Sequence, residues 1–179
     1  TDFGPRDTLE IELLNFLSGI YGHVSYERIL SGPGIADIYR FFKSKRGGYE
    51  PERLKKRFEK GDAAPVITDE ALSGGDKNCK DALELFISIY GAEAGNVALK
   101  SLALGGVYIG GGIAPKILKA MEKGAFLESF RKKGRFERLL SEVPVAVILN
   151  EKTGLLGAAA CALNLLRGRG RGKISAIIY

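Results

Sequence analysis

Three consecutive glycines, Gly110, Gly111 and Gly112, are the residues whose type and spacing point most directly to chemistry. They follow a short apolar run, 107–109, and precede Pro115, which suits the first turn of a helix. Glycine costs stability inside a strand or a helix, so such a run indicates unusual backbone dihedrals or the close approach of a ligand to the backbone. The free N–H groups at a helix start favour a phosphate or another dense acceptor.

The spacing of these glycines matches neither the dinucleotide fingerprint nor the phosphate loop that ends in Lys-Ser or Lys-Thr. On the residues alone, a tight structural turn is the favoured interpretation and contact with a nucleotide is the alternative. The missing fingerprint also weighs against a dinucleotide-dependent oxidoreductase.

Glu27 is the second candidate, in the first turn of a helix predicted to begin at Ser25. The helix dipole stabilises an acid there, which would leave Glu27 exposed and dispensable. Alternatively, a carboxylate beside the glycine break at 31–34 could accept hydrogen bonds from the hydroxyls of a small ligand. On the residues alone we favour the first hypothesis. The sole histidine, His23, has no partner in a catalytic pattern, so we expect a structural or surface role for it.

Composition and cysteine usage exclude several classes of protein. An apolar content of 45% and a charged content of 27% are typical of a folded soluble protein. No window approaches the ~18 apolar residues of a membrane span. Cys79 and Cys161 lie far apart with no His or Cys nearby, which argues against a metal site or a disulfide framework. It is compatible with a reducing compartment.

Much of the net positive charge of the chain lies in its C-terminal residues, 167–179. The net charge is +6 and the isoelectric point is about 9.3. The tail 167–179 supplies four of the 27 basic residues and no acid, so residues 1–166 hold 23 basic against 21 acidic residues. The body is nearly balanced, and we do not expect nucleic acid as a partner.

Helical spacing of apolar residues predicts the elements that position these candidates. Gly91 and Gly95 interrupt the longest pattern and would let another element pack closely against it. A polar loop is expected over Lys43–Gly61. Helices are expected over 8–21, from Ser25 to a terminating break at 31–34, over 35–42, from Thr68, from about Asp76 to 102, from about Ala114, and over 126–132, 136–141 and 154–166.

Two fully apolar runs, Val107–Ile109 and Pro144–Leu149, are each followed by a helix. Such runs are typical of strands buried on both faces of an α/β sheet. Two parallel strands do not make a stable sheet alone, so either further strands escape detection or they lie outside this sequence. We therefore expect a helix-rich α/β fold with an incomplete central sheet.

Four segments together resemble, in order and spacing, the C-terminal half of bacterial-type ATP-dependent glucokinases. The likeness covers nearly all of residues 1–166 and implies the actin-like ATPase (ribonuclease H-like) fold of sugar kinases, with two α/β lobes and a cleft between them. Residues 1–166 would form the larger part of the C-terminal lobe, and 167–179 a basic tail of unknown role. The segments are GHVSYERILSGPGIADIYRFF (22–42), GGVYIGGGIAPKIL (105–118), FLESFRKKGRFERLLSEVPVAVILN (126–150) and TGLLGAAACAL (153–163).

The resemblance changes the interpretation of individual residues. Glu27 matches a family glutamate that hydrogen-bonds glucose hydroxyls, so here we reverse our preference. Gly110, Gly111 and Gly112 match the glycine-rich adenosine motif, where the backbone lies against the nucleotide. The glycines of 31–34 fall in the family's Ser-Gly-Pro-Gly segment and are expected to shape the sugar site.

The family implies phosphorylation of glucose to glucose 6-phosphate with ATP, with Mg²⁺ accompanying the phosphates. The general-base aspartate, the Glu-Gly-Gly-His sugar motif and the first phosphate loop are expected upstream of Thr1. No catalytic residue or metal ligand is therefore assigned here, and the chain alone is expected to be inactive. Glucose and ATP are the expected ligands, the expected location is cytoplasmic, and a homodimer is left open. The alternative is a non-catalytic sugar- or nucleotide-binding relative whose basic tail contacts an anionic partner.

Overall fold

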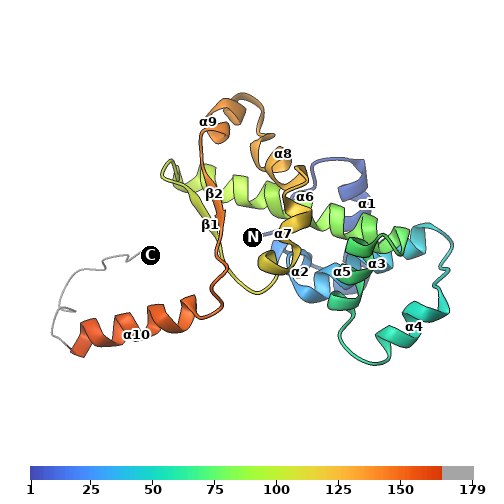
Figure 1. Cartoon of the computed structure of the whole chain (residues 1–179). Coiled ribbons are helices and arrows are strands. Elements are labelled where there is room, and N and C mark those ends of the chain that lie inside the picture. Colours follow the sequence, from blue (N-terminus) through green and yellow to red (C-terminus); the bar gives the residue numbers. More distant parts are fainter. Residues whose placement is uncertain (167–179) are drawn as a thin grey trace.

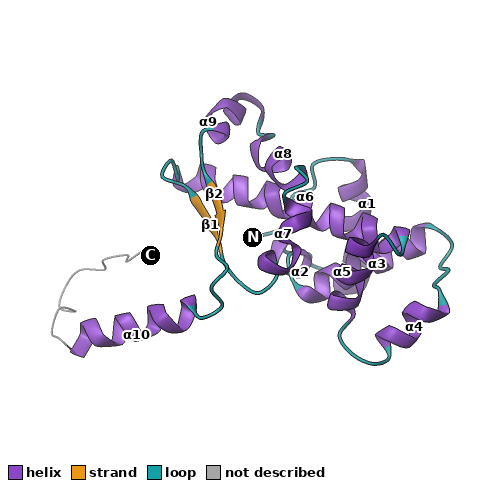
Figure 2. Cartoon of the chain, viewed as in Figure 1, coloured by secondary structure: helices purple, strands orange, loops and turns teal. Residues whose placement is uncertain are grey.

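The computed structural model describes residues 1–166, which form a body of helices around one long helix, α6 (Figures 1 and 2). In chain order the elements are α1 (Thr8–Tyr21), α2 (Tyr26–Ile29), α3 (Gly32–Lys45), α4 (Glu52–Phe58), α5 (Ala63–Ser73), α6 (Lys77–Ser101), β1 (Val107–Ile109), α7 (Ala114–Met121), α8 (Ala125–Arg131), the 3-10 turn η1 (Gly134–Phe136), α9 (Glu137–Ser141), β2 (Val145–Val147) and α10 (Thr153–Leu166). The predicted tail, 167–179, lies outside the described residues.

Helix α6 is the centre of the hydrophobic core and packs against α3, α5 and α8. It begins where predicted, because the Asp76 carboxylate accepts a hydrogen bond from the Cys79 N–H at 2.9 Å. Ala82, Phe86 and Ile89 are fully or almost fully buried along it.

Close packing of α8 on α6 depends on Gly91 and Gly95, as predicted. A Cβ atom at Gly91 would collide with the carbonyl oxygen of Phe126, and one at Gly95 with that of Phe130. Both phenylalanines lie on α8 and are buried. The two glycines therefore let the backbones of the two helices approach to a distance that no side chain would permit.

The predicted helix break at 31–34 both separates two helices and opens the second of them. Helix α2 ends at Ile29, and the Ser31 hydroxyl then caps α3 by accepting the Gly34 N–H at 3.1 Å. A Cβ atom at Gly34 would collide with the Ile29 carbonyl oxygen. Glycine is therefore required where the two helices join.

Two predictions about the following region are wrong. The expected polar loop contains α4, a helix anchored by the fully buried Leu54. Helix α5 begins at Ala63, not at Thr68, because the Asp62 carboxylate accepts the Ala64 N–H at 3.2 Å. In both cases tertiary packing and a local cap outweigh a polar composition.

Strands β1 and β2 pair in parallel, with Val107 opposite Val145 and Ile109 opposite Val147. The prediction that both faces are buried is wrong: Ile109 is buried, but Tyr108 is 59% exposed and Ala146 is also exposed. Within residues 1–166 no third strand extends this sheet. The incomplete sheet is thus confirmed, and it leaves one face of each strand uncovered.

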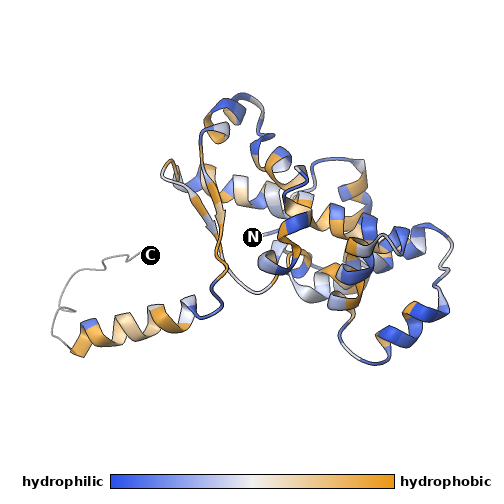
Figure 3. Cartoon of the chain, viewed as in Figure 1, coloured by the Kyte–Doolittle hydropathy of each residue, from blue (hydrophilic) through white to orange (hydrophobic). Residues whose placement is uncertain are grey.

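Helix α10 confirms the predicted final helix and extends away from the body (Figure 1). Figure 3 shows that its surface is largely apolar. None of its residues is buried by any other described part of the chain, and its exposed leucines are Leu155, Leu156, Leu163, Leu165 and Leu166. None of the described helices has both the length and the apolarity needed to cross a membrane.

Candidate functional site

The glycine turn follows β1 directly and leads into α7. The last pairing of the sheet is a hydrogen bond from the Ile148 N–H to the Ile109 carbonyl at 2.9 Å. Gly111 has a φ of +105°, a conformation that residues with a side chain rarely adopt. A structural turn therefore accounts for glycine at position 111.

The same explanation does not cover Gly110 and Gly112, whose φ values are not in the positive region. A Cβ atom at Gly112 would meet no atom within 4 Å, and one at Gly110 would make only an ordinary contact with Ile148 at 3.7 Å. All three glycines are exposed. The backbone here is open to an incoming ligand, and no other described part of the chain fills that space.

The start of α7 lies next to this open backbone. Ile113 precedes the helix and gives it no side-chain cap, and Pro115 lies in its first turn. The first N–H groups of a helix have no partner within the helix. An acceptor placed against the glycines would therefore find backbone N–H donors that no side chain among residues 1–166 caps.

Glu27 lies in the first turn of α2, as predicted, where the Ser25 hydroxyl accepts the Arg28 N–H at 3.2 Å. Its side chain is exposed and makes no hydrogen bond or ion pair with any residue in 1–166. The neighbouring Arg28 guanidinium instead covers the Tyr21 ring at 4.1 Å from its centroid. The Glu27 carboxylate therefore keeps its full capacity to accept hydrogen bonds.

No hydrogen bond or ion pair joins Glu27 to the glycine turn in the described residues. Helix α2 packs on α3, whereas α7 packs on α6, α8 and β2. His23 lies at the surface, where its Nε2 is 2.7 Å from the Asp2 carboxylate. That hydrogen bond lowers the pKa of Asp2 and helps hold the N-terminal residues beside α2.

A match to a known family covers almost all of these residues. The family model described as Glucokinase matches residues 1–165. The chain belongs to the glucokinase family. A glucokinase of Synechocystis sp. is 44% identical over 174 residues, which cover 90% of this chain and 49% of its own length. A glucokinase of Nostoc sp. is 45% identical over 177 residues, with 92% and 52% covered.

A solved structure agrees with this family. The crystal structure of a glucokinase from an Antarctic psychrotroph superposes with a TM-score of 0.77 at 34% identity, covering 92% of this chain and 48% of that chain. The predicted actin-like ATPase fold of sugar kinases is thus confirmed. The chain spans about half the length of the curated glucokinases it matches.

The glucokinase family implies a magnesium ion beside the ATP phosphates, and the described residues do not fit one. Within residues 1–166, no three His, Cys, Asp or Glu side chains come together in a way that could hold a metal ion. We therefore derive no step through a metal held by these residues.

One feature of this glucokinase-family chain has no counterpart among the sequence motifs. A cavity of about 710 Å³ lies between the start of α1, α6 and α8, away from Glu27 and the glycine turn. Its polar side chains include Arg6, Ser88 and Lys133, which come from three separate segments. No spacing in the sequence connects them, so no motif could have revealed the cavity.

Proposed function

We propose that this chain supplies part of the glucose and ATP sites of an ATP-dependent glucokinase, which transfers the γ-phosphoryl group of ATP to glucose and forms glucose 6-phosphate. Residues 1–166 would be the larger part of its C-terminal lobe. The observation that carries the proposal is the family match over residues 1–165.

The adenosine part of ATP would lie against Gly110, Gly111 and Gly112. Exposed backbone with space above Gly111 and Gly112 supports this role, because a planar base or ribose can approach it without a side chain in the way. Glycine at 110 and 112, which the backbone conformation does not demand, is then explained by the ligand.

Glu27 would accept hydrogen bonds from glucose hydroxyls. A carboxylate has about four lone-pair sites and forms stronger hydrogen bonds than a neutral acceptor. Glu27 has no competing partner within 1–166, which supports this role.

Phosphoryl transfer needs a group that takes the hydroxyl proton and charges that stabilise the transferred phosphoryl. We assign neither to this chain and expect it to be inactive alone. Mg²⁺, a cytoplasmic location and a homodimer belong to the same proposal. The free thiols of Cys79 and Cys161 fit a reducing compartment, and the exposed leucines of α10 fit association.

A chimera tests this function. The half of the Synechocystis glucokinase that matches this chain is replaced by residues 1–166, and glucose-dependent ATP consumption is measured. We expect glucose phosphorylation. Glu27→Gln should raise the KM for glucose by about tenfold or more and leave the KM for ATP within about twofold, because it removes a charge-assisted acceptor for sugar hydroxyls.

Glu59→Gln is the matched control, since Glu59 is also exposed and without an ion pair in the described chain. It should change neither KM. An unchanged KM for glucose in Glu27→Gln would remove Glu27 from the sugar site. A folded chimera that binds both ligands but transfers no phosphate would instead support the non-catalytic relative.

A further inference from the structure

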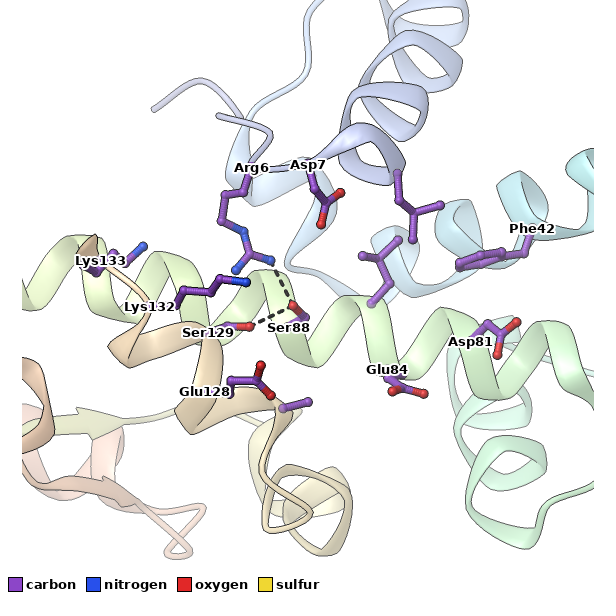
Figure 4. A pocket seen from close by; sticks show the side chains of 13 residues that line it. Arg6, Asp7, Phe42, Asp81, Glu84, Ser88, Glu128, Ser129, Lys132 and Lys133 are labelled. Atoms are coloured by element: carbon purple, nitrogen blue, oxygen red, sulfur yellow. Dashed lines mark hydrogen bonds between the residues drawn. The ribbon is translucent and has the colours of Figure 1, made fainter. Parts of the chain in front are cut away.

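The cavity between α1, α6 and α8 is built from segments far apart in the sequence. Residues Arg6 to Leu9 form one wall, the α6 face from Asp81 to Ser88 forms the floor, and Ala125 to Lys133 on and after α8 form the other wall (Figure 4). Its volume of about 710 Å³ lies within the range of small-molecule sites.

Arg6, Lys132 and Lys133 lie together on one side of this cavity, its cationic end (Figure 4). Asp7 lies beside Arg6, and its carboxylate accepts the Glu10 N–H at 2.9 Å. The Arg6 guanidinium is fixed in place: its Nε donates to the buried Glu10 carboxylate at 3.0 Å, and its Nη2 donates to the Ser88 hydroxyl at 2.9 Å. Its Nη1 makes no hydrogen bond with any described residue. The guanidinium is therefore oriented before a ligand arrives, with donor capacity left over.

The two hydroxyls beside it form a pair. Ser88 Oγ and Ser129 Oγ lie 2.8 Å apart, and Ser129 is buried. Because Arg6 donates to Ser88 and one hydroxyl donates to the other, one hydroxyl hydrogen has no acceptor among residues 1–166. The pair can donate it to a ligand in the cavity.

The two lysines add positive charge beside Arg6. Lys133 Nζ donates to the Ala92 carbonyl at 2.8 Å and to Asn96 Oδ1 at 2.7 Å. Burial and, after it, repulsion from Arg6 lower the pKa of Lys133. Lys132 is exposed, forms no ion pair in the described chain, and directs its ammonium toward Arg6 and the serines (Figure 4). A bound anion would relieve this repulsion.

Glu84 lines the other side of the cavity, its acidic end, and Glu128 lies next to Ser129, between the two ends (Figure 4). Both are exposed, and neither forms an ion pair with another described residue. Carboxylates accept hydrogen bonds from hydroxyls and repel a second anionic group. The ligand that fits both ends therefore has one anionic head and a hydroxyl-bearing body.

We propose that this cavity binds a sugar phosphate, with the phosphate at the cationic end and the sugar hydroxyls at the acidic end. Phosphate oxygens form strong charge-assisted hydrogen bonds with guanidinium and ammonium groups. The site is separate from Glu27 and the glycine turn. A ligand there joins α1, α6 and α8 and stabilises the folded chain by mass action.

Titration calorimetry on the full 179-residue chain tests the site with glucose 6-phosphate, inorganic phosphate and glucose as probes. Glucose 6-phosphate is chosen as the probe because of the proposed function, whereas the proposal of the site itself does not depend on that function. We expect glucose 6-phosphate to bind more tightly than inorganic phosphate. Lys132→Gln should weaken its binding about tenfold, because it removes a charged donor, and Ser88→Ala should weaken it less.

Lys100→Gln is the matched control, since Lys100 is an exposed lysine on α6 away from the cavity. It should leave the affinity within about twofold. If Lys132→Gln and the unaltered chain bound glucose 6-phosphate with equal affinity, the proposal would be overturned. Equal binding of glucose 6-phosphate and inorganic phosphate would also overturn it, because the acidic end would then recognise no sugar.

Glu27→Gln separates this proposal from the proposed function. If glucose 6-phosphate binding is lost in Glu27→Gln and retained in Lys132→Gln, the ligand occupies the glucose site, and the cavity proposal fails while the proposed function stands. If the reverse holds, the cavity is the site. Loss of glucose binding alone in Glu27→Gln concerns only the proposed function.

Discussion

Glu70 holds α4 and α5 together through two arginines. Its carboxylate is buried, and it accepts hydrogen bonds from Arg53 and, at 2.7 Å, from Arg57. Burial alone would raise the pKa of Glu70, but the two guanidinium hydrogen bonds outweigh it and hold the pKa below its usual value. The ionised carboxylate is therefore the form that the folded chain prefers.

Glu70→Gln should lower the free energy of unfolding by roughly 1 to 2 kcal/mol at pH 7, because the half-exposed arginines lose a charged partner. Its unfolded pKa is near 4.5 and its folded pKa is lower. The difference between the unaltered chain and the variant should thus be full above pH 5 and shrink as pH falls through the folded pKa.

Urea unfolding between pH 3 and pH 7 measures this difference. Asp69→Asn is the control, because Asp69 is exposed and lies 3.3 Å from Arg57. Asp69→Asn should lower the free energy of unfolding by less than about 0.5 kcal/mol. A difference for Glu70→Gln that stays constant down to pH 3 would mean that the two arginines do not favour the ionised form.

At the scale of elements, the contact of α6 with α8 leaves no room for a side chain at Gly91. Gly91→Ala should lower the free energy of unfolding by roughly 2 to 4 kcal/mol, because the new methyl group collides with the Phe126 carbonyl and forces the helices apart. Chemical denaturation of the purified chain measures this loss.

Gly19→Ala is the matched substitution on α1. A Cβ atom at Gly19 would meet nothing within 4 Å, so the better helix propensity of alanine should raise the free energy of unfolding by about 0.5 to 1 kcal/mol. If both substitutions changed the free energy of unfolding in the same direction, Gly91 would not be required for the close approach of α6 and α8.

The sequence predicts helices well where a cap and an apolar period coincide, as at Asp76 for α6. It fails where packing decides, as for α4, whose polar composition hides the single buried Leu54. It also predicts that both strands are buried on two faces, because an apolar run does not say whether its covering elements are present. Tyr108 and Ala146 show that in the described chain they are not.

For the molecule as a whole, α10 is an apolar helix without a described partner. Leu155→Ser combined with Leu163→Ser should leave the free energy of unfolding within about 0.5 kcal/mol, because both leucines are exposed. The same double variant should self-associate less at high concentration, since it interrupts an apolar surface. Urea unfolding and sedimentation velocity measure the two effects.

Leu13→Ser is the contrasting substitution, because Leu13 is fully buried. It should lower the free energy of unfolding by about 3 kcal/mol or more. A comparable loss in the double variant would show that α10 packs on the body of the chain.

Family and fold could be predicted from the sequence because four segments agree in order and spacing over nearly the whole described chain. The glycine turn and Glu27 could be singled out from their residue types and positions, and their ligand roles, which the resemblance implies, stay predictions. The cavity could not be found, because Arg6, Ser88 and Lys132 become neighbours only when α1, α6 and α8 pack together.

The position of α6 in the chain also sets an order in time. Its partners α3 and α5 precede it, and α8 follows it. In a chain that emerges from the ribosome N-terminus first, α3 and α5 can pack on each other but lack their shared partner until α6 has been made. The face of α6 that contains Gly91 and Gly95 is covered only after α8 has been made. By this order, the packing of α6 on α3 and α5 can form before the packing of α6 on α8.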